Sequence, residues 1–392
     1  MSRENLNRVL SVILGVVMVF LSAPFSFAVT TEDEYDIYVA GVQITKSNKD
    51  DVLGDGGSVK YNAGVLSLTN ANITQAYFSD NASPAGYFGI KSYDELTVKL
   101  EGENKIDFSK LSVEDPSTKI VNGICIVFGD RFEITGSGSL KIVTPDGVSD
   151  SRGIDNANGT ISITGGCVEI YTGDAYNPKG IDAENLYVEG GSTLKVFTGD
   201  IKTNGYSRSI NCGVSCDSFI VTKNSSVYIE NGDIIALTPA EHTYADLNCG
   251  IYSQKGVHVS GSSLTALAGK TSGIESVENG KGSYGIYSEY DEVTFENSNL
   301  IASGYDFAVK NEYINVNDAE YAGLEFFYSD NVDGSELKKY ENTIAQKQFD
   351  KPYLVIAPDG TVELPQKSFF EKIADFFRNI FESIVRVFES LF

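Results

Sequence analysis

Hydrophobic and polar residues alternate along most of the chain in short runs that are separated by turns rich in Gly and Asn. One unit recurs: a Gly-Ile or Gly-Val pair, several polar residues, a short alternating run, a turn and a second alternating run. Residues 153–170 show the order clearly, with Ile161-Ser162-Ile163 and Val168-Glu169-Ile170 as the two runs. Two-residue alternation places aliphatic side chains on one side of a strand and polar ones on the other. The pattern therefore predicts half-buried β-strands.

The unit repeats with a variable length but a constant internal order. It starts at Gly89, Gly123, Gly153, Gly180, Gly213, Gly250 and Gly285, with a truncated copy at Ala308. The starts lie 34, 30, 27, 33, 37, 35 and 23 residues apart. A solenoid tolerates insertions at its corners while the inward residues stay in register. We predict an all-β chain whose residues 81–318 form a parallel β-helix, with an antiparallel propeller or sandwich as the alternative fold.

The segments before the repeat predict export and a capped solenoid. Arg3 and Arg8 precede an apolar run over residues 9–21 and the small-x-small phrase Ser26-Phe27-Ala28. This is the pattern of a secretory signal peptide, and the run is shorter than the roughly 20 residues of a membrane span. We expect a signal peptide over residues 1–28 and a secreted protein that can be associated with the cell surface; an uncleaved anchor is the alternative. Residues 29–80 are expected to form an N-terminal β cap.

The segments after the repeat predict a C-terminal β extension or cap (319–357), a linker (358–367) and an amphipathic helix (368–392). Ser368 and Glu371 fit a helix capping box, and Phe and Ile residues then recur at helical spacing. The polar residues of this tail are of mixed charge rather than basic. It is therefore expected to contact protein, either a second copy or a partner, more than a membrane.

The charge of the chain narrows the classes of partner. The formal net charge is −24 at pH 7. Such a surface repels nucleic acid and anionic lipid and attracts divalent cations. The five cysteines are too few for a disulfide-built scaffold and leave at least one thiol unpaired. The hydrophobic core must therefore supply the stability.

The repeat phrases carry a family resemblance. The Gly-Ile starts and the phrases at 161–166 and 186–191 resemble those of secreted bacterial carbohydrate-binding-domain proteins, whose fold is a right-handed parallel β-helix related in shape to pectate lyases. Residues 35–44 and 51–56 are similar to the N-terminal signature of clostridial surface proteins of this kind. The resemblance covers roughly residues 35–316 and implies a right-handed coil and an extracellular protein that binds polysaccharide or cell-wall glycan.

Two pairs of aspartates are candidate calcium ligands. Asp155 and Asp182 follow Gly-Ile in successive units, and Asp174 and Asp200 follow Thr-Gly. Stacked coils would set the two backbones of each pair about 4.8 Å apart. Carboxylates that close repel unless a proton or a cation such as Ca²⁺ lies between them. Exposed acids that splay into water are the alternative interpretation.

Outward aromatic residues are the candidate glycan-binding groups. Tyr171 and Phe197 lie beside the Thr-Gly-Asp phrases, while Tyr252 and Tyr287 share a Gly-Ile-Tyr-Ser frame. Sugar rings bind flat aromatic faces, and calcium can bridge a uronate to carboxylates, so the strip suits an acidic glycan. Ordinary packing between neighbouring strands is the alternative.

Cys212 and Cys249 are the candidate disulfide pair. They lie in matched Asn-Cys-Gly phrases, so stacking would bring their Cα atoms within the range of roughly 4.4 to 6.8 Å that a disulfide requires. The orientation of the Cβ vectors decides whether the bond can form.

The sequence favours a non-catalytic protein. The paired aspartates, Gly-His-Gly and Arg-x-Lys motifs of polygalacturonases are not present as a set. The cluster Asp150-Ser151-Arg152 resembles a lyase centre most closely, so a calcium-dependent polysaccharide lyase that uses Arg152 is the enzymatic alternative. A structural or adhesive surface protein is the third hypothesis.

Overall fold

The computed structural model of the chain contains a parallel β-solenoid of about six turns. It describes residues 34–80, 85–203, 209–237, 246–271, 282–290, 293–311, 324–340 and 351–358. All of these except Glu34 belong to one compact unit, Tyr35–Phe392. The predicted signal peptide and the predicted C-terminal helix lie outside the described residues.

Each turn of the solenoid contributes strands to a first, a second and a third face, in that order along the chain. The first face contains β7 (Gly86–Ser92), β10 (Ile120–Ile126), the beginnings of β13 (Val148–Thr164) and β15 (Ala175–Glu189), β18 (Ile210–Cys216), β22 (Leu247–Ser253), β25 (Gly282–Ser288) and β28 (Phe307–Asn311). The second face contains β4 (Val65–Thr69), β8 (Leu96–Glu101), β11 (Arg131–Gly136), the ends of β13 and β15, β19 (Ser218–Val221), β23 (Val257–Ser260) and β26 (Val293–Glu296).

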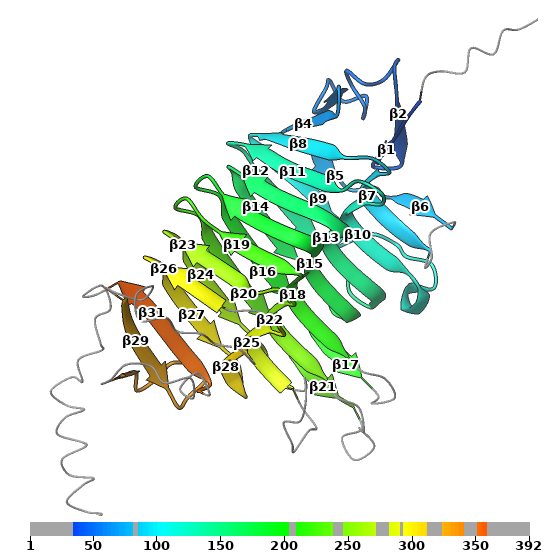
Figure 1. The fold of residues 1–392 in the computed structure, drawn as a ribbon. Coiled ribbons are helices and arrows are strands. Elements are labelled where there is room, and N and C mark those ends of the chain that lie inside the picture. The colour runs from blue at the N-terminus through cyan, green and yellow to red at the C-terminus, as the bar shows by residue number, and fades with distance from the viewer. Residues whose placement is uncertain are drawn as a thin grey trace, which may run out of the picture. The chain divides into compact units, whose positions relative to one another are not determined.

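The third face forms a separate sheet. It contains β5 (Asn72–Ile73), β9 (Glu103–Asp107), β12 (Ser139–Val143), β14 (Cys167–Tyr171), β16 (Thr193–Thr198), β20 (Ser226–Asn231), β24 (Ser263–Leu267) and β27 (Asn299–Ser303). These strands lie side by side in sequence order in Figure 1. The short strands β17 (Ile201–Thr203) and β21 (Ile234–Ala236) pair in parallel after the third face.

The Gly-Ile units stack in register, as the sequence predicted. Ile154 is the register partner of Ile124 on one side and of Ile181 on the other. The same ladder runs from Ile90 through Val214, Ile251 and Ile286 to Val309. Because these pairings are parallel, the antiparallel propeller and sandwich alternatives are wrong.

Aliphatic ladders fill the interior between the faces. On the third face the inward residues Ile106, Ile142, Ile170, Val196 and Ile229 are register partners in turn, and all are fully buried. The second face contributes a matching ladder that includes Ile163 and Val188. The inward side chains of each coil pack against the other faces and against the coils above and below, which is why the order within a unit is constant while its length varies.

Buried amides satisfy the backbone at the corner between the third and first faces. The Asn231 Nδ2 donates to the Cys249 carbonyl at 2.7 Å, and the Asn248 Nδ2 donates to the Gly232 carbonyl at 2.8 Å. The Asn211 Nδ2 donates to the carbonyls of Gly199 and Gly232. These bonds tie the carbonyls of successive coils together at the corner.

Antiparallel strands flank the parallel stack at both ends. At the N-terminal end, β1 (Glu34–Val39) and β6 (Tyr77–Ser79) pair antiparallel with β7, and β3 (Val59–Asn62) pairs with β4. The strand β2 (Val42–Thr45) pairs with β1. Since β4 and β5 already pair in parallel with β8 and β9, the parallel stacking begins inside the segment expected to form the cap.

At the C-terminal end, β31 (Tyr353–Pro358) pairs antiparallel with both β27 and β29 (Leu324–Ser329), and β30 (Lys338–Lys339) pairs with β29. The one helical element of the described residues is the 3-10 turn η1 (Pro116–Thr118). Within the described ranges, no helix has the length and apolar character that a bilayer crossing demands.

Candidate functional site

A row of aspartates follows the corner between the third and first faces. The backbone amide of Asp174 donates to Asp146 Oδ1 at 2.9 Å, and the amide of Asp200 donates to Asp174 Oδ1 at 2.9 Å. The amide of Asp233 donates in turn to Asp200 Oδ1 at 2.8 Å. Each carboxylate thus bridges to the next coil through one oxygen.

The sequence predicted the stacking of Asp174 and Asp200 but missed Asp146 and Asp233. The signal was present, because Asp146 follows Thr144-Pro145 and Asp233 follows Asn231-Gly232 at the same place in their units. The prediction relied on the exact phrase Thr-Gly-Asp, whereas the two positions before the aspartate also accept Pro, as in Thr144-Pro145, or Asn, as in Asn231-Gly232.

Hydrogen bonds favour the ionised form of Asp174. Burial alone would raise the pKa of Asp174, but the Lys202 ammonium and the Asp200 amide both favour the carboxylate and lower that pKa below its ordinary value. The Lys202 Nζ lies 2.8 Å from Asp174 Oδ2. Among the described residues, nothing donates a hydrogen bond to Oδ2 of Asp146 or of Asp200.

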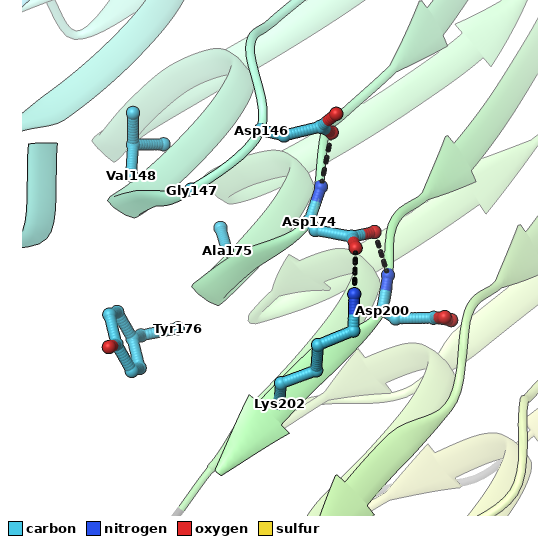
Figure 2. Close-up of a pocket in the computed structure, with 8 residues that line it drawn as sticks. All are labelled: Asp146, Gly147, Val148, Asp174, Ala175, Tyr176, Asp200 and Lys202. Atoms are coloured by element: carbon cyan, nitrogen blue, oxygen red, sulfur yellow. Dashed lines mark hydrogen bonds and ion pairs between the residues drawn. The ribbon is translucent and has the colours of Figure 1, made fainter.

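A cavity of about 390 Å³ opens beside this row. Figure 2 shows Asp146, Asp174 and Asp200 in a line along one side, with Tyr176 across from them and Lys202 below. Gly147, Val148 and Ala175 complete the lining. The side chain of Tyr176 is exposed, with 51% of its residue surface accessible. The cavity therefore offers an aromatic ring and several polar oxygens to one small molecule. Tyr176 was not among the residues predicted from the sequence.

The predicted aromatic pair Tyr171 and Phe197 lies on the other side of the same corner, on the third face. The two residues are register partners, and their rings stack with centroids 4.8 Å apart at 11°. The Lys141 ammonium lies 4.3 Å above the Tyr171 ring, and Tyr228 packs against Phe197 at 5.6 Å. Because the ring faces contact one another and Lys141, this pair presents mostly ring edges to solvent.

The predicted pair Asp155 and Asp182 stacks on the first face, with Arg152 beside it. The two aspartates are register partners. The Arg152 Nη1 lies 2.9 Å from Asp155 Oδ2 and 3.3 Å from Asp182 Oδ2, and Lys179 Nζ lies 2.7 Å from Asp182 Oδ2. Asp150 is a third carboxylate partner of Arg152, at 3.7 Å. A guanidinium thus stands where the sequence analysis expected a metal cation.

This ion network is largely shielded from water. Burial raises the pKa of Asp155 above its ordinary value, although the Arg152 guanidinium pulls it the other way. The Asn122 Nδ2 also donates to Asp155 Oδ2 at 3.0 Å. Among the described residues, the buried Arg152 Nε and Asn122 Oδ1 have no hydrogen-bond partner. Calcium binding at Asp155 and Asp182 stays a prediction.

The second predicted aromatic pair, Tyr252 and Tyr287, is remote from the first because it lies on the first face. The two are register partners, with ring centroids 5.6 Å apart. Tyr287 is buried, and the Tyr252 hydroxyl donates to Glu289 Oε2 at 2.5 Å. Cys212 and Cys249, also register partners on this face, lie in the same hydrophobic cluster as Tyr287. The structure therefore places the four aromatic residues in two sites rather than in one strip.

A second cavity, of about 350 Å³, lies on the second face around Lys255, His258 and Thr294. The His258 Nδ1 and the Thr294 hydroxyl lie 2.7 Å apart. The phenyl ring in its lining, Phe219, is fully buried. This cavity lacks the exposed aromatic ring of the corner cavity, so it is the weaker candidate for a sugar.

The described residues contain no group of three or more His, Cys, Asp or Glu side chains arranged to hold a metal ion. Comparison of the chain with protein-family models, with curated proteins and with solved structures gives no match.

Proposed function

We propose that the chain is a secreted or cell-surface protein that binds a polysaccharide without cleaving it, and that the corner cavity holds one sugar ring. The observation that carries the proposal is the exposed Tyr176 ring across the cavity from the row of Asp146, Asp174 and Asp200. A cavity of about 390 Å³ has the size of a small-ligand pocket.

The chemistry of the lining matches a sugar. One face of a pyranose ring carries C–H groups that pack on an aromatic ring, while its edge carries hydroxyls that donate hydrogen bonds. Tyr176 supplies the ring, and the Oδ2 atoms of Asp146 and Asp200, which accept no hydrogen bond from a described residue, supply the acceptors. The Lys202 ammonium can donate to a hydroxyl or ring oxygen. A hydrogen bond to a charged acceptor is stronger than a neutral one, so two such contacts can orient the ring.

The charge of the cavity decides how an acidic glycan could bind. Its lining has three aspartates and one lysine, so a uronate carboxylate would be repelled. An acidic glycan therefore requires a cation such as Ca²⁺ to bridge the two sets of carboxylates, as the sequence analysis expected. A neutral glycan requires none, and calcium dependence separates the two classes of ligand.

Glycan-array binding of the full chain, with and without calcium, tests the proposal. Tyr176→Ala should weaken binding about tenfold, as the loss of one aromatic contact predicts. Tyr305→Ala is the matched control, since Tyr305 is also an exposed tyrosine but does not line the cavity. Unchanged binding by Tyr176→Ala would refute the site, and the absence of any binding would favour a structural or adhesive role. Unsaturated oligosaccharide release would establish the lyase alternative.

The finer architecture is also part of the proposal. We infer that the solenoid is right-handed, because parallel strands joined by a crossover are right-handed in about 98% of cases. The antiparallel strands β1, β3 and β6 would cap its N-terminal end, and residues 368–392 would form an amphipathic helix that contacts protein. Residues 1–28 would direct export, so N-terminal sequencing of the exported protein should begin at Val29. An exported chain that still begins at Met1 would contradict cleavage.

A further inference from the structure

Two buried thiols face one another across neighbouring coils of the first face. Cys212 on β18 and Cys249 on β22 are register partners. Their Sγ atoms lie 3.0 Å apart, closer than two sulfurs approach in ordinary van der Waals contact. Both residues are buried, with exposed fractions of 1% and 0%. The Cβ orientation that the sequence could not decide therefore directs both sulfurs toward each other.

The environment isolates this pair from the other cysteines. Cys212 and Cys249 belong to a hydrophobic cluster with Leu247, Tyr284 and Tyr287, separate from the main core. Cys216, on the same strand as Cys212, packs in the main core instead. Cys125 is the register partner of Asp155, and Cys167 lies on the third face. All five cysteines carry free thiols in this structure.

We propose that Cys212 and Cys249 are a redox cross-linking site that forms a disulfide between successive coils. The co-reactant is a small-molecule disulfide such as oxidised glutathione. One protein thiolate attacks it and releases one thiol, and the second protein thiolate then displaces the other half as a second thiol. One protein S–S bond forms as the S–S bond of the co-reactant breaks; the protein loses two electrons and two protons, and the co-reactant gains both.

The cross-link would join the two successive units that are farthest apart in sequence. The units that begin at Gly213 and Gly250 are 37 residues apart, the longest spacing in the repeat. A cross-link restricts the unfolded chain more when it closes a longer loop, so this step gains most from one. Parallel pairing already holds the two Cα atoms in register, so the bond requires little change of the backbone.

The test is oxidative refolding of the full chain in a glutathione redox buffer, followed by alkylation under denaturing conditions and peptide mass spectrometry. The expected result is a linked peptide pair containing Cys212 and Cys249, with Cys125, Cys167 and Cys216 alkylated. Five alkylated cysteines, stable glutathione adducts on Cys212 or Cys249, or a link through Cys216 would each overturn the proposal.

A stability measurement provides an independent readout. Reductant should lower the thermal midpoint of the oxidised wild-type chain by about 5 °C. It should have no effect on Cys212→Ser or Cys249→Ser. Cys216→Ser is the matched control, because Cys216 is also buried and lies on β18, and it should keep the response to reductant. A reductant response that persists in Cys212→Ser would contradict the assignment even if all variants fold.

Discussion

Replacing Arg152 with glutamine should expose how the first face holds its stacked carboxylates. Arg152 is the cation between Asp155 and Asp182, and its side chain is 20% exposed. Glutamine retains much of the length and the polarity of the side chain but removes the charge. The variant therefore leaves two stacked aspartates with Lys179 as their remaining cationic neighbour.

The cost follows from the spacing of the coils. Register partners in neighbouring strands lie about 4.8 Å apart, and two negative charges at about 5 Å repel by roughly 3 kcal/mol at an effective dielectric constant of 20. Lys179 offsets part of this repulsion, while the loss of the Arg152 hydrogen bonds adds to the cost. We expect Arg152→Gln to lower the free energy of unfolding by about 3 kcal/mol at pH 7, within the range for breaking shielded ion pairs.

The pH dependence identifies the cause. Without the guanidinium, the pKa of Asp155 should rise further above its ordinary value than burial already raises it. A raised carboxyl pKa means that stability is present below the ordinary aspartate pKa and is lost as pH rises through the folded-state pKa. Urea denaturation should therefore show a large deficit at pH 7 and less than half of it near pH 4.

Two variants make this test specific. Arg131→Gln is the matched control, because Arg131 pairs with Glu133 at 3.2 Å but is 60% exposed, and it should cost less than about 1 kcal/mol. Adding Asp155→Asn to Arg152→Gln should recover most of the loss. A deficit that does not depend on pH, or that Asp155→Asn fails to relieve, would refute the electrostatic explanation. Restoration of stability by calcium in Arg152→Gln alone would show that the aspartate pair can hold a metal once the guanidinium is removed.

Two further predictions concern the packing of the core and the loss of stability at acidic pH. Ile163→Ala should lower the free energy of unfolding by about 3 kcal/mol, because Ile163 is fully buried in the second-face ladder. In the same urea titration, replacement of the outward-facing neighbour, Ser162→Ala, should change it by less than about 0.5 kcal/mol. Equal effects would contradict the assignment of Ile163 to the interior and Ser162 to the surface. Burial opposes ionisation of Asp107, but Lys105 and Ser109 lower its pKa to about 2. Asp107→Asn should therefore lower the free energy of unfolding by about 1 kcal/mol above pH 5, after allowance for solvent screening. In acid titrations this deficit should vanish as pH falls toward 2.

The stacking of the coils could be predicted from the sequence because it depends on inward residues. Each Gly-Ile pair must meet the pair above it to bury its isoleucine, so the register of Asp155 with Asp182 and of Cys212 with Cys249 followed directly. Side-chain alternation along the strands was also sufficient to assign Tyr171 and Phe197 to the outer surface.

The environment of the outward residues could not be predicted in the same way. The sequence did not reveal that Tyr252 lies on a different face from Tyr171, whose strand alternates between buried and half-buried residues, whereas the first-face strand of Tyr252 is buried along nearly its whole length. It also did not place the Arg152 guanidinium between two aspartates, since that placement depends on the side-chain torsions of Arg152 and not on the strand register. Tyr176 was missed because it follows a corner, where the two-residue alternation stops.

Spin–spin distances test the stacked register most directly. Thr97, Glu133, Ser162, Tyr187, Ile220, His258 and Thr294 are successive partners in one outward ladder. Labels at Thr97 and His258 should be about 24 Å apart, and labels at Thr97 and Thr294 about 29 Å apart, since each coil adds about 4.8 Å. An increase of about one strand spacing between the two pairs is the predicted result. A shorter distance for the second pair, or distances beyond about 40 Å, would contradict the parallel stack.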